Sequence, residues 1–511
     1  MTHAMEEVAQ ADLILVVGAD VYRDNLIFSN KMRQALRKNN AKIIVVDPRR
    51  TKWEQWANLW LRPLPGTDIA WINGLLRLLV EKGVSSKAFI ESKTDGFEAM
   101  HSSLGTFTPG FVESASGITA RDLESAARLY ASARRRAIVF GSGVTQHLSG
   151  SETVRALCNL ALLTGETEEG GGGLYPMLTQ SNAVGAFDMG VAFDLLPGCQ
   201  RVDDERARKR FEAVWGKALP ETPGLSYVEM FDKIPEGKIK ALYVFGEDPL
   251  ITLPNLERVK SGLHQLEFLV VQDQFMTHLG NYAHVILPGV SFAEKDGTFT
   301  NMEGRVQRVR KAISPVGSSR PDGEIFCDIS SRMGYPMSYQ GPAQVMEEIS
   351  SIVPSYAGMT YPELERGGIR RSETGTGRKR FFPVEFREPS EKPDGRYPLW
   401  IIPRGFHYPY VIGTTTKRAA GLAKVLPGTC VELHPEDARR AGLQDGDPVN
   451  MVSPRGKIET ICKISDAVPK GIAYVATSFW PAFVNDLLAT GFDPMGRNPE
   501  YKVMVGRVEK R

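Results

Sequence analysis

ADLILVVGAD, residues 11–20, decides the fold, because the same pattern returns about 230 residues later as KALYVFGEDP, residues 240–249. In both stretches an apolar run ends in Gly, and an acidic residue follows within two positions. A second apolar run ends in Asp in each copy, at Asp47 and at Asp273. The chain therefore carries one strand–helix–strand unit twice, and each copy predicts part of a parallel sheet.

This unit has the features that a dinucleotide-binding half-fold requires. A Gly in the first turn lets the backbone approach a phosphate, the following helix N-terminus stabilises its charge, and a carboxylate after the next strand accepts hydrogen bonds from ribose or base. Two copies predict two nucleotide sites, or one site and a remnant of duplication. A doubly wound sheet without ligand remains an alternative. A simple NAD enzyme is less favoured, because neither copy contains G-x-G-x-x-G.

Composition narrows the class of protein. The chain has 511 residues, a net charge of +2 and 24% charged residues, so it is long enough for several domains and its charge does not favour nucleic acid as a partner. No apolar run approaches the ~20 residues of a membrane span, and no signal peptide is recognisable. Five cysteines without a C-x-x-C pair argue against an iron–sulfur or zinc site in these residues and favour the cytoplasm.

Four parts follow one another along the chain. Alternating strands and helices predict a first α/β dinucleotide-binding domain over residues 1–180 and a second over 181–335. Residues 336–396, rich in Pro, Gly and charge, are expected to be a linker or insertion. Short β-rich segments with frequent turns predict a β-barrel-like domain over 397–511. The helices expected from periodicity are 29–38, 121–133, 152–163 and 256–265.

Further motifs extend the pattern over nearly the whole chain. With them the sequence resembles the molybdopterin oxidoreductases of the dimethyl-sulfoxide-reductase superfamily, most closely the formate dehydrogenase catalytic (alpha) subunit. The resemblance implies an α/β fold of two related doubly wound parallel-sheet domains followed by a double-psi type barrel. It also implies two molybdopterin guanine dinucleotides that hold a molybdenum or tungsten ion. The motifs include GSGVTQH (141–147), QSNAVGAFDMG (180–190), HVILPGVSFAEKDGTFTNMEGRVQR (284–308), VELHPEDARRAGLQDGDPV (431–449) and NPEYKVMVGRVE (498–509).

The resemblance also implies which residues bind these cofactors. Their alternative role is that of ordinary turn and helix-cap residues. For the first dinucleotide the residues are Gly18, Asp20, Asp47, Arg49, Gly66 and Asp68. For the second they are Gly246, Glu247, Asp248, Gln272, Asp273 and Thr277. The pterin-facing residues are Gly143, Val144, Thr145, Gln146 and Gln180, and the C-terminal domain adds Arg404, Gly405, His407, Thr415, Asn485, Tyr501 and Lys502.

The family's most recognisable signature in this chain is Asn301-Met302-Glu303-Gly304-Arg305-Val306-Gln307. Its content is expected to be structural in part, since Gly304 permits a tight turn and Arg305 can pair with an acidic neighbour. No residue of the chain is assigned a catalytic or metal-ligating role.

Two departures from the family pattern affect the function. Catalytic chains of the family begin with a cysteine-ligated four-iron cluster domain and supply a Cys or selenocysteine ligand to the metal. Neither is found here, so both are expected on an upstream cluster-bearing chain or another oxidoreductase subunit. Leu178 stands where formate dehydrogenases carry an Arg. An aliphatic side chain cannot make the forked, charge-assisted contact that a carboxylate calls for, so formate is not assigned as the substrate.

Two classes of function remain open. The chain is either the dinucleotide-binding part of a split molybdenum or tungsten oxidoreductase, inactive when isolated, or a non-catalytic scaffold like the large subunit of NADH-quinone oxidoreductase. In either class a partner chain is expected to cover exposed sheet edges and apolar surface, which we expect at the N-terminal end of the chain.

Overall fold

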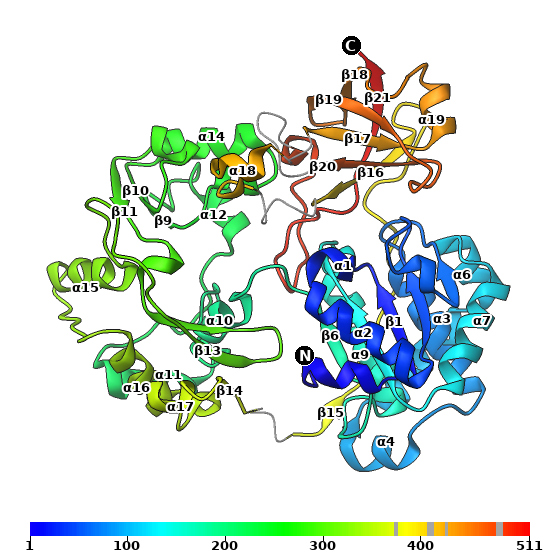
Figure 1. The fold of residues 1–511 in the computed structure, drawn as a ribbon, viewed down its shortest axis with the longest axis horizontal. Helices are drawn as coiled ribbons and strands as arrows, with labels where there is room; N and C mark the ends of the chain where they lie inside the picture. The colour runs from blue at the N-terminus through cyan, green and yellow to red at the C-terminus, as the bar shows by residue number, and fades with distance from the viewer. Residues whose placement is uncertain (373–376, 406–412, 425–427, 477–483) are drawn as a thin grey trace. The chain divides into compact units, whose positions relative to one another are not determined.

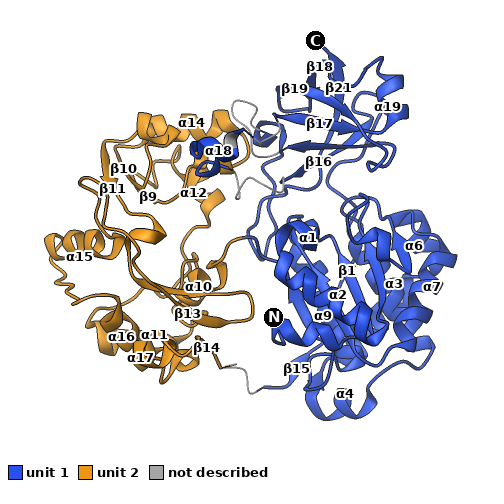
Figure 2. Cartoon of the chain, viewed as in Figure 1, with its two compact units in different colours: residues 1–179, 377–511 blue, residues 180–376 orange. Residues whose placement is uncertain are grey.

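The structure of the protein is a computed structural model that divides the chain into two compact units, drawn in blue and orange in Figure 2. Unit 1 consists of Met1–Thr179 and Gly377–Arg511, and unit 2 consists of Gln180–Thr376. The first α/β domain and the C-terminal domain therefore belong to the same unit. The residues that the structure describes are 1–372, 377–405, 413–424, 428–476 and 484–511.

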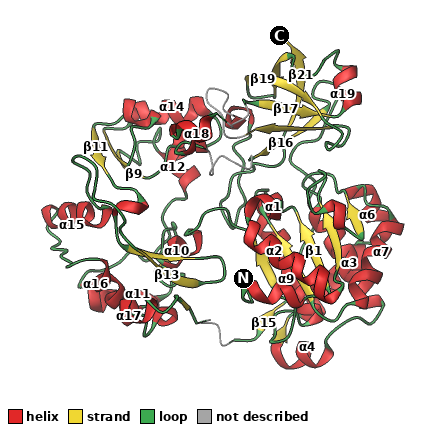
Figure 3. Cartoon of the chain, viewed as in Figure 1, coloured by secondary structure: helices red, strands yellow, loops and turns green. Residues whose placement is uncertain are grey.

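A parallel five-stranded sheet forms the centre of the α/β part of unit 1, in the order β3-β2-β1-β5-β6 (Figure 1). Leu13 in the central strand lies opposite Lys42 on one side and Arg136 on the other. All five residues of this strand are buried, because helices cover both faces of the sheet (Figure 3). The strands are β1 (Leu13–Val17), β2 (Lys42–Val46), β3 (Leu59–Leu61), β5 (Arg136–Phe140) and β6 (Leu174–Pro176), with the separate pair β4 (Thr94–Asp95) and β15 (Lys379–Arg380).

The helices of this part follow from apolar spacing and from capping. In α2, Phe28, Met32 and Ala35 lie on one face and are buried. Asn25 caps the same helix, because its side-chain oxygen accepts a hydrogen bond from the Phe28 amide at 2.9 Å. The helices are α1 (Val21–Asp24), α2 (Leu26–Asn39), α3 (Asp68–Glu81), α4 (Lys87–Lys93), α5 (Phe97–Ser103), α6 (Pro109–Ser116), α7 (Ala120–Ser132), α8 (Ser142–Thr145) and α9 (Gly150–Thr164).

The C-terminal part of unit 1 is a closed six-stranded barrel in the order β16-β20-β17-β19-β18-β21, which confirms the expected barrel. Alternate residues of β19 are buried, and its inward side chains join a core with Val431, Met451 and Val475. The strands are β16 (Leu399–Arg404), β17 (Cys430–Leu433), β18 (Pro448–Val452), β19 (Lys457–Ile464), β20 (Ile472–Ala476) and β21 (Val505–Lys510), with helices α18 (Ala420–Ala423) and α19 (Pro435–Arg440).

Unit 2 contains the second copy of the repeated pattern as a parallel three-stranded sheet in the order β11-β10-β9. The fold class is therefore confirmed: α/β units with parallel sheets, followed by a barrel. The strands are β7 (Leu195–Leu196), β8 (Gln200–Arg201), β9 (Ala241–Phe245), β10 (Phe268–Asp273), β11 (Val285–Pro288), β12 (Gly297–Thr300), β13 (Arg305–Val309) and β14 (Ile369–Arg370). The helices are α10 (Ala183–Asp188), α11 (Glu205–Trp215), α12 (Tyr227–Lys233), α13 (Pro249–Thr252), α14 (Leu256–Gln265), α15 (Asp322–Arg332), α16 (Pro342–Ile352) and α17 (Tyr361–Leu364).

Much of the stretch expected to be a linker or insertion is folded. Helix α16 buries Met346 and Ile352, and together with Tyr356 and Leu364 they form part of a core within unit 2. The sequence PAQVMEEISSI is amphipathic, but the Pro, Gly and charged residues around it hide the pattern. Further along, β15 pairs with β4 and so belongs to unit 1.

The signature at residues 301–307 forms the turn of a hairpin between β12 and β13. The Asn301 side chain accepts hydrogen bonds from the amides of Glu303, at 3.1 Å, and Arg305, at 3.0 Å. The Arg305 Nε donates to Glu303 at 2.8 Å, and Gly304 has φ +78°. These contacts agree with the expected structural role.

The expected apolar surface at the N-terminal end is found only in part, at Leu26 and Ile27, which are 47% and 69% exposed. Val8 and the whole of β1 are buried. The amide of Thr2 donates to the carbonyl oxygen of Leu174 at 3.1 Å, so the first residues run along the edge strand β6. The N-terminal region is therefore packed against its own sheet.

Candidate functional site

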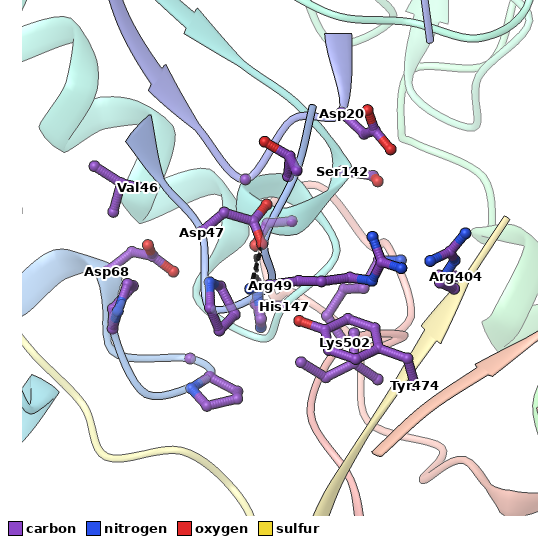
Figure 4. Close-up of a pocket in the computed structure, with 18 of the residues that line it drawn as sticks. Asp20, Val46, Asp47, Arg49, Asp68, Ser142, His147, Arg404, Tyr474 and Lys502 are labelled. Carbon is purple, nitrogen blue, oxygen red and sulfur yellow. Dashed lines mark hydrogen bonds between the residues drawn. The ribbon is translucent and has the colours of Figure 1, made fainter. Parts of the chain in front are cut away.

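A pocket in unit 1 lies where the sheet and the barrel meet (Figure 4). The sheet contributes the turns after β1, β2, β3 and β5, and the barrel contributes side chains such as Tyr474. The residues expected from sequence that line it are Gly18, Asp20, Asp47, Arg49, Gly66, Asp68, Gly143, Arg404 and Lys502. The carboxyl ends of parallel strands are where α/β sheets bind their ligands.

Two glycines bring the turns after β1 and β5 into direct contact. Gly18 has φ +52°, and a Cβ there would lie 2.9 Å from Gly143 backbone atoms. A Cβ on Gly143 would lie 2.8 Å from Gly18, whose carbonyl oxygen accepts the Gly143 amide at 3.0 Å. Neither position has room for a side chain, and the wall they form is main chain only.

The repeat supplies an internal control for this contact, because Gly246 in unit 2 has φ +62° but nothing within 4 Å of an added Cβ. We expect Gly246→Ala to cost about 1–2 kcal/mol of unfolding free energy for the left-handed backbone alone. Gly18→Ala adds the collision with Gly143, for a total of roughly 3 kcal/mol or more. The measurement is the thermal unfolding midpoint of each variant. Equal decreases for Gly18→Ala and Gly246→Ala would contradict this explanation.

Carboxyl groups form one side of the pocket. Burial raises the pKa of Asp47 to about 7, an effect that the Arg49 amide, donating at 2.8 Å, partly offsets and that the charge of Asp20 increases. Burial also raises the pKa of Asp68 to about 6, although the indole Nε1 of Trp71 donates to it at 3.1 Å. Burial outweighs the hydrogen bonds that these two carboxyl groups accept, which suits a ligand that supplies further N–H or O–H donors.

Cations form the other side. Arg49 and Arg404 both donate to one carboxylate oxygen of Glu432, at 3.0 and 3.2 Å. Lys502 donates to a main-chain carbonyl at 2.7 Å, and burial together with the charge of Arg23 lowers its pKa to about 8. Burial and the charge of Arg49 also lower the pKa of Arg404. Buried cations that outnumber their acidic partner favour an anionic ligand, and guanidinium groups suit phosphate.

The buried polar atoms at this site that have no hydrogen-bond partner among the described residues include Asp20 Oδ1 and Arg49 Nε. An unpaired acceptor and an unpaired donor each cost about 1–3 kcal/mol. A ligand that offers both hydroxyl or amide donors and phosphate oxygens would satisfy them, so the residues fit a dinucleotide.

The raised pKa of Asp47 predicts a specific pH dependence for the ligand-free chain. The folded chain holds the Asp47 proton more tightly than the unfolded chain, so this contribution to stability is complete below about pH 4 and is lost as pH rises through about 7. Asp47→Asn lacks that titration. Relative to Asp47→Asn, the wild type should lose about 4 kcal/mol between pH 4 and pH 8. A difference in thermal stability that stays constant over this range would contradict the assignment.

The first turn of unit 2 repeats the main-chain geometry of unit 1. The Gly18 amide donates to the carbonyl oxygen of Val46 at 2.9 Å, and the Gly246 amide donates to that of Gln272, also at 2.9 Å. Each acceptor is the residue directly before the aspartate that ends the second apolar run of its own copy. The two turns therefore take equivalent positions, each within its own unit.

The aspartates of the two copies are equivalent as well. Asp47 accepts a hydrogen bond from the amide of Arg49 at 2.8 Å, and Asp273 accepts one from the amide of Phe275 at 2.9 Å. Each aspartate stands at the carboxyl end of the second strand of its copy of the repeat, β2 and β10. This confirms the duplication that the sequence indicates.

The other unit 2 residues that were expected to bind the second dinucleotide make hydrogen bonds within unit 2. Asp248 caps α13 and accepts the amide of His278 at 3.0 Å. The fully buried amide of Gln272 donates to Asp322 at 2.8 Å. Burial raises the pKa of Glu247, to which the Thr252 hydroxyl donates at 2.7 Å. Thr277 precedes the short 3-10 turn His278–Asn281.

The remaining expected residues do not line the unit 1 pocket. Val144 is part of the hydrophobic core, and the carbonyl oxygen of Gln146 accepts the amide of Tyr501 at 3.2 Å. His407 lies outside the described residues. The others are Thr145 in α8, Gln180 at the start of unit 2, Gly405 after β16, Thr415 before Thr416–Arg418, and Asn485 in Val484–Leu487.

Among the lining residues that sequence reasoning missed are Arg23, His147 and Tyr474. His147 belongs to the motif GSGVTQH, so its place in that motif was the available signal. Its Nε2 lies 2.6 Å from the carbonyl oxygen of Gly143, and burial lowers its pKa to about 4, so the ring is neutral. Tyr474 comes from a barrel strand, and nothing in the local sequence indicates it.

Comparison with known proteins identifies the family. Residues 1–332 match the family model described as Molybdopterin oxidoreductase, and residues 400–505 match the Molydopterin dinucleotide binding domain. The chain belongs to the molybdopterin oxidoreductases, and it resembles formate dehydrogenase subunits of that family.

Individual relatives agree with this assignment. The F420-dependent formate dehydrogenase subunit alpha of Methanocaldococcus jannaschii is 35% identical over 530 residues, which span all of this chain and 78% of the relative. Formate dehydrogenase H of Escherichia coli is 34% identical, over all of this chain and 74% of the relative. Acetylene hydratase from Pelobacter acetylenicus shares the fold, with a TM-score of 0.78 at 18% identity over 99% of this chain and 81% of that one.

Among the helices that the structure describes, none is both long enough and apolar enough to cross a bilayer.

Proposed function

We propose that the chain binds two molybdopterin guanine dinucleotides around a molybdenum or tungsten ion, as part of a formate dehydrogenase-like oxidoreductase whose iron–sulfur cluster lies on a separate chain. Family membership supports the cofactor class, and the repeated turns at Gly18 and Gly246 support the number. When bound, the metal and its pterins supply the redox chemistry. The residues of this chain bind the dinucleotides, orient them and exclude water.

In unit 1 the roles follow from charge. Asp47 and Asp20 accept hydrogen bonds from guanine or ribose, since burial raises the pKa of Asp47 and Asp20 Oδ1 has no partner among the described residues. Arg49, Arg404 and Lys502 hold the diphosphate, since Arg49 and Arg404 share one acid, Glu432, and burial lowers the pKa of Lys502 to about 8. In unit 2 the equivalent turn and Asp273 hold the second dinucleotide.

The proposal rests mainly on one observation: Arg49, Arg404 and Lys502 line the same pocket as the main-chain contact between Gly18 and Gly143. Its test replaces Lys502 with Met, which keeps the length of the side chain and removes the charge. We expect the assembled complex to lose guanine dinucleotide at least tenfold faster with Lys502→Met than with Lys470→Met, a control whose lysine pairs with Glu436 on the barrel surface. Equal retention by the two variants would contradict the role of Lys502.

The partner is expected to be a cluster-bearing chain, in the cytoplasm. The name of the Methanocaldococcus jannaschii relative describes a subunit alpha, which is one member of an assembly. The sparse cysteines of this chain suit a reducing compartment. Formate is the substrate named for the relatives, but Leu178 provides no charge for a carboxylate, so the proposal covers the class of enzyme and not the substrate.

A non-catalytic scaffold is the second candidate function. Leu178 favours it, and so does the lack of a cysteine among the residues that line the unit 1 pocket. Metal analysis of the complex separates the two functions. An enzyme contains molybdenum or tungsten together with guanine nucleotide, and a scaffold contains neither.

A further inference from the structure

His147 lines the unit 1 pocket, where Figure 4 labels it, and one of its ring nitrogens has no role in the fold. The side chain is only 4% exposed, and its Nδ1 has no hydrogen-bond partner among the described residues. Buried polar atoms normally have a partner, because an unpaired one destabilises the folded chain. A group from outside the chain is therefore expected to bond to this nitrogen.

The other ring nitrogen fixes the chemical state of the ring. His147 Nε2 lies 2.6 Å from the carbonyl oxygen of Gly143, and a carbonyl oxygen can only accept, so Nε2 carries the proton. Burial lowers the pKa of His147 to about 4, although the bond to Gly143 opposes this effect. The ring therefore carries one proton at neutral pH, and Nδ1 is an acceptor with a free lone pair.

The main chain holds this ring in one orientation. The Gly143 carbonyl belongs to α8, and the ring caps it, as a His side chain can do near a helix C-terminus. The amide of the same glycine donates to the carbonyl oxygen of Gly18 at 3.0 Å. His147 is thus attached to the glycine contact that forms the main-chain wall. A rotation that used Nδ1 within the chain would break its bond to Gly143.

The segment that carries Lys502 lies beside the same loop. The Tyr501 amide donates to the carbonyl oxygen of Gln146 at 3.2 Å, so the residues that follow each of them, Lys502 and His147, are close in space. Both line the pocket, and the charge of Lys502 contributes to the low pKa of His147. The neutral acceptor therefore lies beside a cation that is assigned to the diphosphate.

We propose that His147 is a binding residue of the unit 1 site, whose Nδ1 accepts a hydrogen bond from an N–H or O–H group of the dinucleotide next to the diphosphate. This inference rests on the proposed function for the identity of the ligand. Arg49, Arg404 and Lys502 can only donate, which suits phosphate oxygens. His147 adds an acceptor among these donors, so it selects a ligand that carries a donor beside its phosphates.

Two substitutions separate the roles of the two ring nitrogens. His147→Gln places an amide N–H near the position of Nε2 and keeps the donor to Gly143. His147→Asn places a carbonyl oxygen near the position of Nδ1 and keeps the acceptor. The variants are compared in the complex obtained by co-expression with the product of the adjoining upstream reading frame, the upstream product.

The two variants should change different properties. We expect His147→Gln to unfold near the wild-type temperature but to lose guanine dinucleotide roughly fivefold faster or more. His147→Asn should unfold at a lower temperature, because the Gly143 carbonyl loses its donor, and should lose the dinucleotide at the wild-type rate. The control is His101→Gln, at an exposed histidine of α5 in the same unit, which should match the wild type in both properties. If His147→Gln retains dinucleotide as well as His101→Gln does, Nδ1 bonds only to water and the inference is overturned.

Imidazole ¹⁵N NMR gives a readout that depends neither on activity nor on the stability of a variant. The chain has 8 histidines, and the signals of His147 are those absent from His147→Gln. In the ligand-free chain at neutral pH, Nδ1 should give the signal of an unprotonated nitrogen, and in the loaded complex that signal should move upfield as the nitrogen accepts a hydrogen bond. A protonated Nδ1, or a signal that is the same in the ligand-free chain and in the loaded complex, would overturn the inference.

Guanosine diphosphate, added to the ligand-free chain, identifies the source of the donor. If it moves the Nδ1 signal, the donor is a ribose hydroxyl or a guanine N–H group. If only the loaded complex moves the signal, the donor belongs to the pterin. Both results support the acceptor role of His147.

The outcome is separable from that of the proposed function. A wild-type complex that assembles without guanine nucleotide would reject the proposed function, and the inference with it. A wild-type complex that contains guanine nucleotide but shows no change at Nδ1 would reject only the role of His147.

Discussion

The chain purified alone is expected to oxidise no formate with any artificial electron acceptor. A thiolate is the form of cysteine that binds a metal, and burial raises the pKa of Cys158, Cys199 and Cys462 to about 11. Burial also raises the pKa of Cys430. No cysteine is among the residues that line the unit 1 pocket. Within the part of the chain that the structure describes, no group of three or more His, Cys, Asp or Glu side chains is placed to hold a metal ion, so we expect no electron transfer by the chain alone.

The measurement is dye reduction by the single chain and by the chain co-expressed with the upstream product, with formate as donor. Metal and nucleotide contents are determined on the same samples, so that a preparation without bound cofactor is not mistaken for an inactive protein. Turnover by the single chain would contradict the expectation that a partner supplies the metal ligand.

The second large effect is expected when the aspartates of the two copies are replaced. Asp47→Ala and Asp273→Ala each remove an acceptor for a buried donor, which costs about 1–3 kcal/mol and corresponds to roughly 5- to 150-fold weaker binding. Because the two residues take equivalent places in their units, each variant should lose dinucleotide from its own unit.

The control for each variant is an exposed aspartate of the same unit that makes a surface ion pair: Asp95, paired with Arg378, and Asp203, paired with Arg201. Asp95→Ala and Asp203→Ala should keep the full guanine nucleotide content. If Asp47→Ala and Asp273→Ala lower the unfolding temperature but leave nucleotide content at the level of the controls, the carboxylates only stabilise their turns and the scaffold function is favoured.

The sequence predicted the repeat and several elements well, because the apolar periodicity there is strong. Helix α14 has the expected bounds of 256–265. Helix α2 begins at Leu26, three residues before the expected start, because Asn25 caps it through a side-chain hydrogen bond. The folded segment around α16 was missed because turn-forming residues surround its amphipathic core.

The candidate site was predictable only where local sequence carries the signal. Gly18 and Asp47 stand at strand ends, so their chemistry and position are readable from the pattern. Arg49 and Glu432, by contrast, come together only because the barrel packs on the sheet, 383 residues apart in the chain. Tyr474, whose ring lies 5.6 Å from the Arg49 guanidinium, is placed by the same packing. Tertiary contacts of this kind leave no trace in a single sequence.

The central claim is that each copy of the repeat holds one guanine dinucleotide, and the most direct test is to count them. The complex of this chain with the upstream product is hydrolysed in acid, and the guanine nucleotide released is measured against protein and against molybdenum or tungsten. We expect two guanine nucleotides per chain and one metal ion. A complex that assembles fully but releases one nucleotide or none would contradict the claim.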